Sequence, residues 1–101
     1  MLFRSVELNP EDGFSRASLA GVYRKQGRTQ ESEEQLMIAR RLMSEENEYN
    51  RACLESISGN VEEAISLLQT AINLRQVEPA WIKWDPDFDF IRDDPRFQEL
   101  M

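Results

Sequence analysis

The chain has 101 residues, enough for one compact domain or for part of one. Its 19 acidic and 12 basic residues give a formal net charge of −7. This balance argues against binding to nucleic acids or to anionic lipid, because both depend on Lys and Arg. There is no histidine and only one cysteine, Cys53, so the chain lacks the commonest general base and metal ligand and can form no internal disulfide.

Helical signals follow one another from the start of the chain. A first helix is expected to end at Asn9-Pro10, because proline cannot continue a helix but suits the start of the next. Its apolar residues are Leu2, Phe3, Val6 and Leu8. A second helix is expected from Glu11 to the glycine at position 27, with acidic residues favouring its N-terminal dipole. Its apolar stripe comprises Phe14, Ala17, Leu19, Ala20, Val22 and Tyr23.

Three further helices are predicted. Thr29 is expected to cap the first of them, which runs to about Met43; its stripe comprises Leu36, Ala39, Leu42 and Met43, broadened by Met37 and Ile38. Residues 46 to 58 form the next, with Tyr49, Ala52, Cys53 and Ile57 inward. Gly59-Asn60 is a strong turn signal before a helix over residues 61 to 74. No segment alternates as a strand would, so the expected fold is all-α.

An internal repeat links these helices. The two glycine turns, at Gly27 and Gly59, lie 32 residues apart. At identical offsets after each glycine the chain has a small, a large and a small residue, namely Ser32, Leu36 and Ala39, and then Ala64, Leu68 and Ala71. Small residues let two antiparallel helices approach, and the large one fills the space between pairs of helices.

This pattern resembles the tetratricopeptide repeat (TPR) family, whose repeats of about 34 residues are antiparallel helix pairs. The first full repeat matches at Leu19-Ala20, Tyr23, Gly27, Leu36 and Ala39, and it departs at Arg16, Ser32 and Ser44. The second matches over residues 59 to 65 and at Leu68, Ala71 and Leu74. Its opening, residues 49 to 53, resembles bacterial members, but Glu55 stands where the family has Tyr.

The ends of the chain extend the resemblance. Residues 5 to 10 resemble the end of a repeat's second helix, so the chain is expected to open inside a repeat. Residues 84 to 100 resemble a closing element that follows the last repeat of many bacterial TPR proteins. In it, Asp94-Pro95 predicts the start of a short helix, and Asp87 is expected to start another turn. Phe88, Ile91, Phe97 and Leu100 are then available to cover the apolar end of the array.

The resemblance therefore implies a right-handed α-solenoid segment with a short C-terminal capping helix. Its expected parts are the end of a truncated repeat (residues 1–10), two TPR repeats (11–44 and 45–76) and capping helices (77–101). Such repeats hold a peptide or helix of another protein in a concave groove. The candidate partner-binding residues are Phe14, Ser18, Arg24, Lys25, Tyr49, Asn50 and Lys83, and Ala17, Gly21, Cys53 and Ser56 also face the groove.

Other interpretations stay open beside this one. Arg24 and Lys25 can simply offset a helix C-terminus, Tyr49 can be a core residue, and Cys53 can be a small buried hydrophobe. A chaperone-tail clamp is disfavoured, since only Asn50 matches its positions. Calcium binding by Asp85, Asp87 and Asp89 is also disfavoured, because the loop lacks an EF-hand's central glycine and terminal glutamate.

No arrangement of residues indicates catalysis, so we expect neither an enzyme nor a cofactor or metal. The expected partner is another protein, with neither nucleic acid nor membrane. The alternative is a structural segment that caps a longer array or forms a homodimer, because Leu2, Phe3, Val6 and Leu8 would lack the helix that normally covers them.

Overall fold

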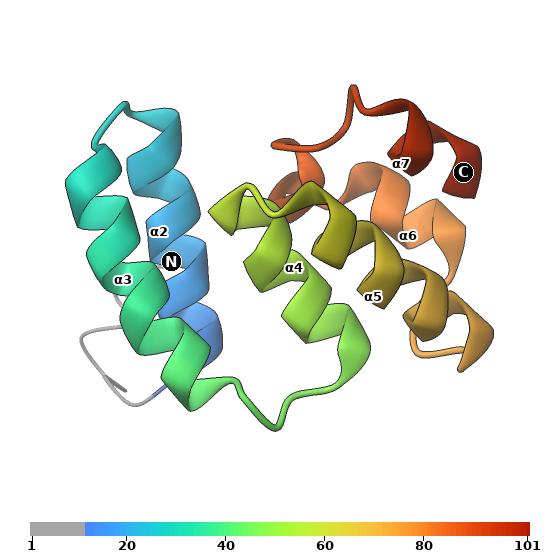
Figure 1. The fold of residues 1–101 in the computed structure, drawn as a ribbon, viewed down its shortest axis with the longest axis horizontal. Helices are drawn as coiled ribbons and strands as arrows, with labels where there is room; N and C mark the ends of the chain where they lie inside the picture. The colour runs from blue at the N-terminus through green and yellow to red at the C-terminus, as the bar shows by residue number, and fades with distance from the viewer. Residues whose placement is uncertain (1–11) are drawn as a thin grey trace. The chain divides into compact units, whose positions relative to one another are not determined.

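A computed structural model describes residues 12–101, in which every regular element is a helix (Figure 1). The all-α prediction is therefore confirmed for this part of the chain. The chain divides between Glu45 and Glu46 into two compact units. The helix predicted before Asn9-Pro10 lies outside the described residues. None of the described helices is both long and apolar enough to cross a membrane.

The first unit contains the helix pair α2 (Gly13–Lys25) and α3 (Thr29–Leu42). Helix α2 begins at Gly13, two residues later than predicted, because the Asp12 carboxylate accepts hydrogen bonds from the N–H groups of Phe14 at 3.0 Å and Ser15 at 3.4 Å. Gly27 follows α2 with a φ of 78°, the left-handed conformation that glycine adopts most readily.

Two predictions for α3 are wrong. Thr29 is its first helical residue rather than its cap; Arg28 occupies the cap position and provides no side-chain hydrogen bond. Met37 does not broaden the buried stripe, since its side chain is 74% exposed. The described residues that are buried in the first unit are Gly13, Ser15, Ala17, Leu19, Ala20, Gly21, Ser32, Leu36, Ala39 and Met43.

The second unit opens with the pair α4 (Glu48–Ser58) and α5 (Val61–Asn73). The Asn47 side chain caps α4 by accepting a hydrogen bond from the N–H of Asn50 at 2.9 Å. Gly59 ends α4 with a φ of 86°. Both predicted helices are confirmed, apart from one or two residues at their ends.

Three short helical elements complete the second unit: α6 (Pro79–Trp84), the 3₁₀ turn η1 (Pro86–Phe88) and α7 (Pro95–Leu100). Asp94 caps α7 as predicted, accepting from the N–H of Arg96 at 2.9 Å. The turn η1 is capped by Asp85, which accepts from the N–H of Asp87 at 2.9 Å. The expectation that Asp87 starts this turn is therefore wrong.

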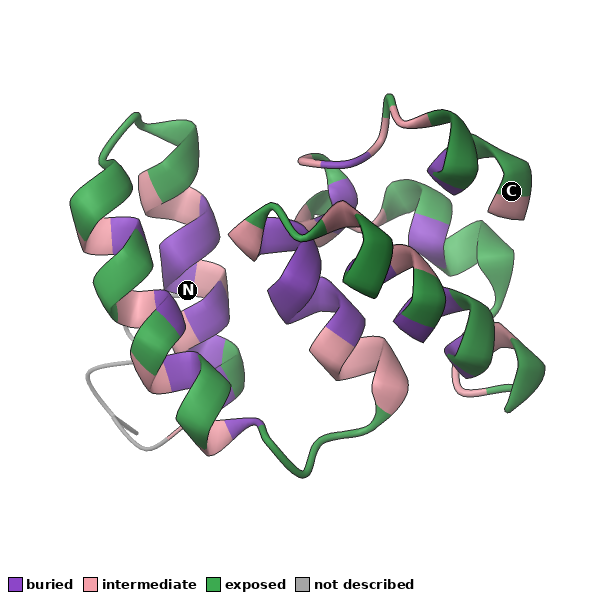
Figure 2. Cartoon of the chain, viewed as in Figure 1, coloured by how far each residue is buried: buried purple, intermediate pink, exposed green. Residues whose placement is uncertain are grey.

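The closing segment, residues 85–101, supplies much of the core of the second unit (Figure 2). Phe88, Ile91 and Phe97 are buried, and the rings of Phe88 and Phe97 lie 6.0 Å apart. They belong to one apolar cluster with Ala52 and Cys53 of α4, Ala64, Leu67 and Leu68 of α5, and Ile82 of α6. Leu100 packs at its edge. These apolar residues therefore pack against the helix pair α4 and α5.

The two helix pairs bury the same positions. Ser32, Leu36 and Ala39 in the first unit and Ala64, Leu68 and Ala71 in the second are all less than a tenth exposed. After each glycine turn, the following N–H donates to the carbonyl five residues back at 2.9 Å, from Arg28 to Tyr23 and from Asn60 to Glu55. The two helix pairs therefore repeat the same turn geometry and the same buried positions, 32 residues apart, as the sequence predicts.

Candidate functional site

The predicted partner-binding residues fall in both units, so we describe each group by itself. Phe14, Ser18, Arg24 and Lys25 lie on α2, whereas Tyr49 and Asn50 lie on α4 and Lys83 on α6. The structure thus spreads four candidates along α2, from its first turn to its last, and places Tyr49 and Asn50 next to each other in the first turn of α4.

On α2, the candidates form an accessible stripe. Phe14, Ser18 and Lys25 follow one another at steps of four and seven residues, which places them on one face of a helix. Phe14 is 40% exposed, Ser18 is partly buried, and Arg24 and Lys25 are exposed. Ala17 and Gly21, two further positions expected to face the groove, are buried.

On α4, the closing segment covers most of the expected groove face. The hydroxyl of Ser56 donates to the backbone carbonyl oxygen of Asp87 at 2.7 Å. The Tyr49 ring lies 5.9 Å from that of Phe88, and its hydroxyl donates to Oδ2 of Asp85. Cys53 and Ser56 are buried. The expectation that these two residues face a partner is therefore wrong, because the chain's own segment occupies that face.

Asn50 and Lys83 remain accessible to different degrees. Asn50 is partly buried, and its side-chain amide donates to Oε1 of Glu46 at 2.8 Å. Lys83 is exposed on the short helix α6. Both can reach solvent, and the hydrogen bond of Asn50 holds its amide beside an acidic side chain.

Cys53, Asp85 and Asp87 each bring one potential metal-ligating atom to within 4.8 Å of the others. Burial, together with the nearby Asp87 carboxylate, raises the pKa of the Cys53 thiol far above its usual value, so the thiol stays protonated. Burial and the hydrogen bond to Asp85 likewise raise the pKa of Tyr49. Both groups act here as neutral hydrogen-bonding partners of the carboxylates.

The acidic string behind the calcium hypothesis is engaged in local structure. Asp85 caps η1 and accepts the Tyr49 bond, while Asp89 accepts from Nη2 and Nε of Arg92 at 2.8 and 3.1 Å. Capping of η1 by Asp85 and pairing of Asp89 with Arg92 therefore explain why these carboxylates occur at this spacing.

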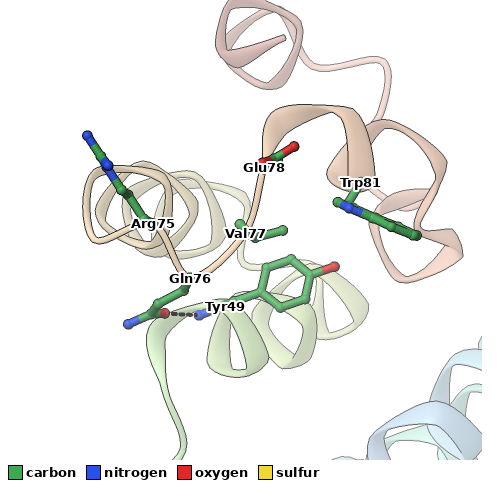
Figure 3. A pocket seen from close by; sticks show the side chains of 6 residues that line it. All are labelled: Tyr49, Arg75, Gln76, Val77, Glu78 and Trp81. Atoms are coloured by element: carbon green, nitrogen blue, oxygen red, sulfur yellow. Dashed lines mark hydrogen bonds between the residues drawn. The ribbon is translucent and has the colours of Figure 1, made fainter.

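A pocket of about 430 Å³ opens beside Tyr49, and Figure 3 shows its lining. Its wall is held in place by Gln76, whose Oε1 accepts from the N–H of Tyr49 at 3.1 Å and whose Nε2 donates to Oε1 of Glu48 at 2.6 Å. The first bond satisfies one of the N–H groups that a helix leaves unpaired in its first turn. The second holds the pKa of Glu48 below its usual value. The lining residues are Tyr49, Arg75, Gln76, Val77, Glu78 and Trp81.

Of these lining residues, sequence reasoning singled out only Tyr49. Trp81, 70% exposed, is the largest apolar side chain at the pocket. Proline at position 79, after Glu78, is a sequence signal for the start of a helix. The helix that follows contains Trp81, but the segment is too short to show helical periodicity. A second exposed tryptophan, Trp84, lines a different pocket of about 320 Å³ with Lys83, Phe97 and Met101.

The comparisons with known proteins assign no family. No protein-family model matches the chain, and neither a curated protein nor a solved structure shows significant similarity to it.

Proposed function

We propose that the chain is a TPR-type scaffold that holds a peptide or helix of another protein through the α2 face of its groove. The observation that carries the proposal is the repeated helix pair: two segments 32 residues apart bury small, large and small residues at the same positions and turn through a left-handed glycine. A right-handed solenoid and the repeat boundaries 11–44 and 45–76 are part of this proposal.

The ligand-contacting residues in this proposal are candidates whose side chains are at least partly accessible. In the first unit they are Phe14, Ser18, Arg24 and Lys25 of α2. In the second unit, taken by itself, they are Asn50 and Lys83. The Tyr49 hydroxyl already donates a hydrogen bond to Asp85, so only the edge of the Tyr49 ring is available to contact a ligand. An exposed aromatic side chain in the first turn of α2 and two cations in its last turn suit recognition of a peptide that runs along the helix, since aromatic and Arg side chains dominate many protein interfaces.

Charge reversal on α2 tests the proposal, with α3 as a matched control. Peptides are selected from a displayed random library against the whole chain, and the affinity of a selected peptide is then measured for two double variants. Arg24→Glu/Lys25→Glu reverses the last turn of α2, and Arg40→Glu/Arg41→Glu reverses the last turn of α3. Both change the net charge equally and remove two cations from a helix C-terminus.

We expect the α2 variant to lose at least about tenfold in affinity, a difference of about 1.4 kcal/mol, and the α3 variant to bind as the original chain does. Equal losses would indicate that helix stability or overall charge decides binding. The alternative function, a structural segment that self-associates, is expected to yield no selectable peptide, with a dimer in sedimentation experiments.

A further inference from the structure

The pocket of Figure 3 places a carboxylate beside an exposed tryptophan. Glu78 occupies the cap position of α6, but its side chain accepts no capping hydrogen bond. Within residues 12–101 its carboxylate has no ion-pair partner either. Trp81, two turns of the pocket wall away in sequence terms only by three residues, is 70% exposed. A carboxylate in this state is available to a cation from outside the chain.

The positive charge that lines the same pocket is directed elsewhere. Figure 3 shows the Arg75 side chain pointing away from Tyr49 and Trp81, whereas the Glu78 carboxylate lies nearer to both. The charge that faces the aromatic part of the pocket is therefore negative.

Two further carboxylates are bonded to lining residues. Glu48 accepts a hydrogen bond from Nε2 of Gln76 at 2.6 Å, and Asp85 accepts one from the hydroxyl of Tyr49. Both bonds have neutral donors, so neither cancels the charge of its carboxylate. Together with the net charge of −7, they favour a cationic occupant over an anionic one.

We infer that this pocket binds the guanidinium group of an arginine side chain from a peptide partner, held between the Glu78 carboxylate and the indole of Trp81. A guanidinium can donate two parallel hydrogen bonds to a carboxylate, and it stacks on aromatic faces, of which tryptophan is the most favourable. The methylene stem of the arginine packs against Val77 and the edge of the Tyr49 ring. The volume of about 430 Å³ suits a side chain of this size. The inference deepens the proposed function, on which it rests for the class of partner.

Titration with blocked amino acids tests the pocket on the whole chain labelled with ¹⁵N. The probes are N-acetyl-arginine-amide, its neutral isostere N-acetyl-citrulline-amide and the acidic N-acetyl-glutamate-α-amide. We expect the arginine probe to shift the Trp81 indole signal, with an affinity about threefold to tenfold above that of the citrulline probe at low salt. The preference should shrink as salt is raised, because the carboxylate lies near the surface.

Matched variants separate the pocket from its surroundings. Glu78→Gln should remove the preference for arginine over citrulline, whereas Glu63→Gln, at an exposed position of α5, changes the net charge equally and should preserve it. Trp81→Ala should abolish the response to the arginine probe, and Trp84→Ala, which removes another exposed tryptophan of α6, should leave it unchanged. Arg75→Gln should retain the response, because the Arg75 side chain points away from the site.

Several outcomes would overturn the inference. These are no response to any probe at millimolar concentration, equal affinity for the arginine and citrulline probes, tighter binding of the glutamate probe, loss of the response in Arg75→Gln, or its retention in Trp81→Ala. Self-association that Trp81→Ala abolishes would assign the pocket to a second copy of the chain instead. The charge reversal on α2 tests the groove independently, so either proposal can fail while the other stands.

Discussion

The hydroxyl of Tyr49 donates a hydrogen bond to Oδ2 of Asp85, a residue 36 positions further along the chain. The bond joins the first turn of α4 to the start of the closing segment, and Ser56 adds a second link through the carbonyl of Asp87. Together they fasten the segment over a face of α4 that a TPR groove would otherwise expose. This fastening limits where the second unit can receive a ligand.

Removing the hydroxyl should loosen that link. We expect Tyr49→Phe to lower the free energy of unfolding by about 1–2 kcal/mol, because a part-buried hydrogen bond to a carboxylate is lost while the ring contact with Phe88 remains. Urea unfolding followed by circular dichroism measures the change. Tyr23→Phe on α2 is the matched control, and a similar loss there would show that the Asp85 bond is not the cause.

Stability should also fall at alkaline pH. The pKa values of Cys53 and Tyr49 are raised in the folded chain, while their unfolded values are about 8.5 and 10. Above these unfolded values the unfolded chain loses protons that the folded chain retains, so their stabilisation is complete at lower pH and is lost as pH rises.

Each group should then reduce the free energy of unfolding by about 1.4 kcal/mol per pH unit once its unfolded form is ionised. Urea titrations between about pH 8 and pH 11 measure this slope. Cys53→Ala should flatten it from about pH 9, and Tyr49→Phe from about pH 10. Identical slopes in the original chain and both variants would contradict the assignment.

Close packing of α4 against α5 can be tested at Ala71, which is fully buried. Ala71→Leu should lower the free energy of unfolding by about 1–3 kcal/mol, because added methyl groups overpack a filled core. Gln69→Leu, at an exposed position of the same helix, should change it by less than about 0.5 kcal/mol. An unchanged urea midpoint for Ala71→Leu would mean that no close helix contact exists there.

The left-handed turn at Arg75 offers a stabilising substitution. Arg75→Gly should raise the free energy of unfolding by about 0.5–1 kcal/mol, because glycine adopts a φ of 60° without the strain that a Cβ causes. The control is Gly59→Ala, which imposes a Cβ on the corresponding turn after α4 and should destabilise the chain. Destabilisation by Arg75→Gly in thermal or urea unfolding would show that the side chain itself supports the turn.

Local signals in the sequence were sufficient for the helix pairs. Small and large residues at fixed offsets identified positions that are buried, and Asp94-Pro95 located the start of α7. Met37 was misassigned because periodicity alone could not tell whether the edge of the stripe meets another element or solvent.

The covered face of α4 could not be read from local patterns. It depends on contacts such as Ser56 with Asp87 and Tyr49 with Asp85, which join residues more than thirty positions apart. The pocket at Trp81 was missed for the same reason, since Tyr49 lies on α4, Arg75 in the connection between α5 and α6, and Trp81 on α6. Helical periodicity describes one element at a time.

The central claim, that α2 rather than α3 faces the partner, is tested most directly by photocrosslinking. Benzoylphenylalanine replaces either Phe14 of α2 or Met37 of α3, two large apolar residues that are 40% and 74% exposed. Each variant is irradiated with the selected peptide at a concentration that saturates the original chain. A crosslink from position 14 alone is the expected result. Equal crosslinking from both positions, or crosslinking from position 37 alone, would contradict binding through the α2 face.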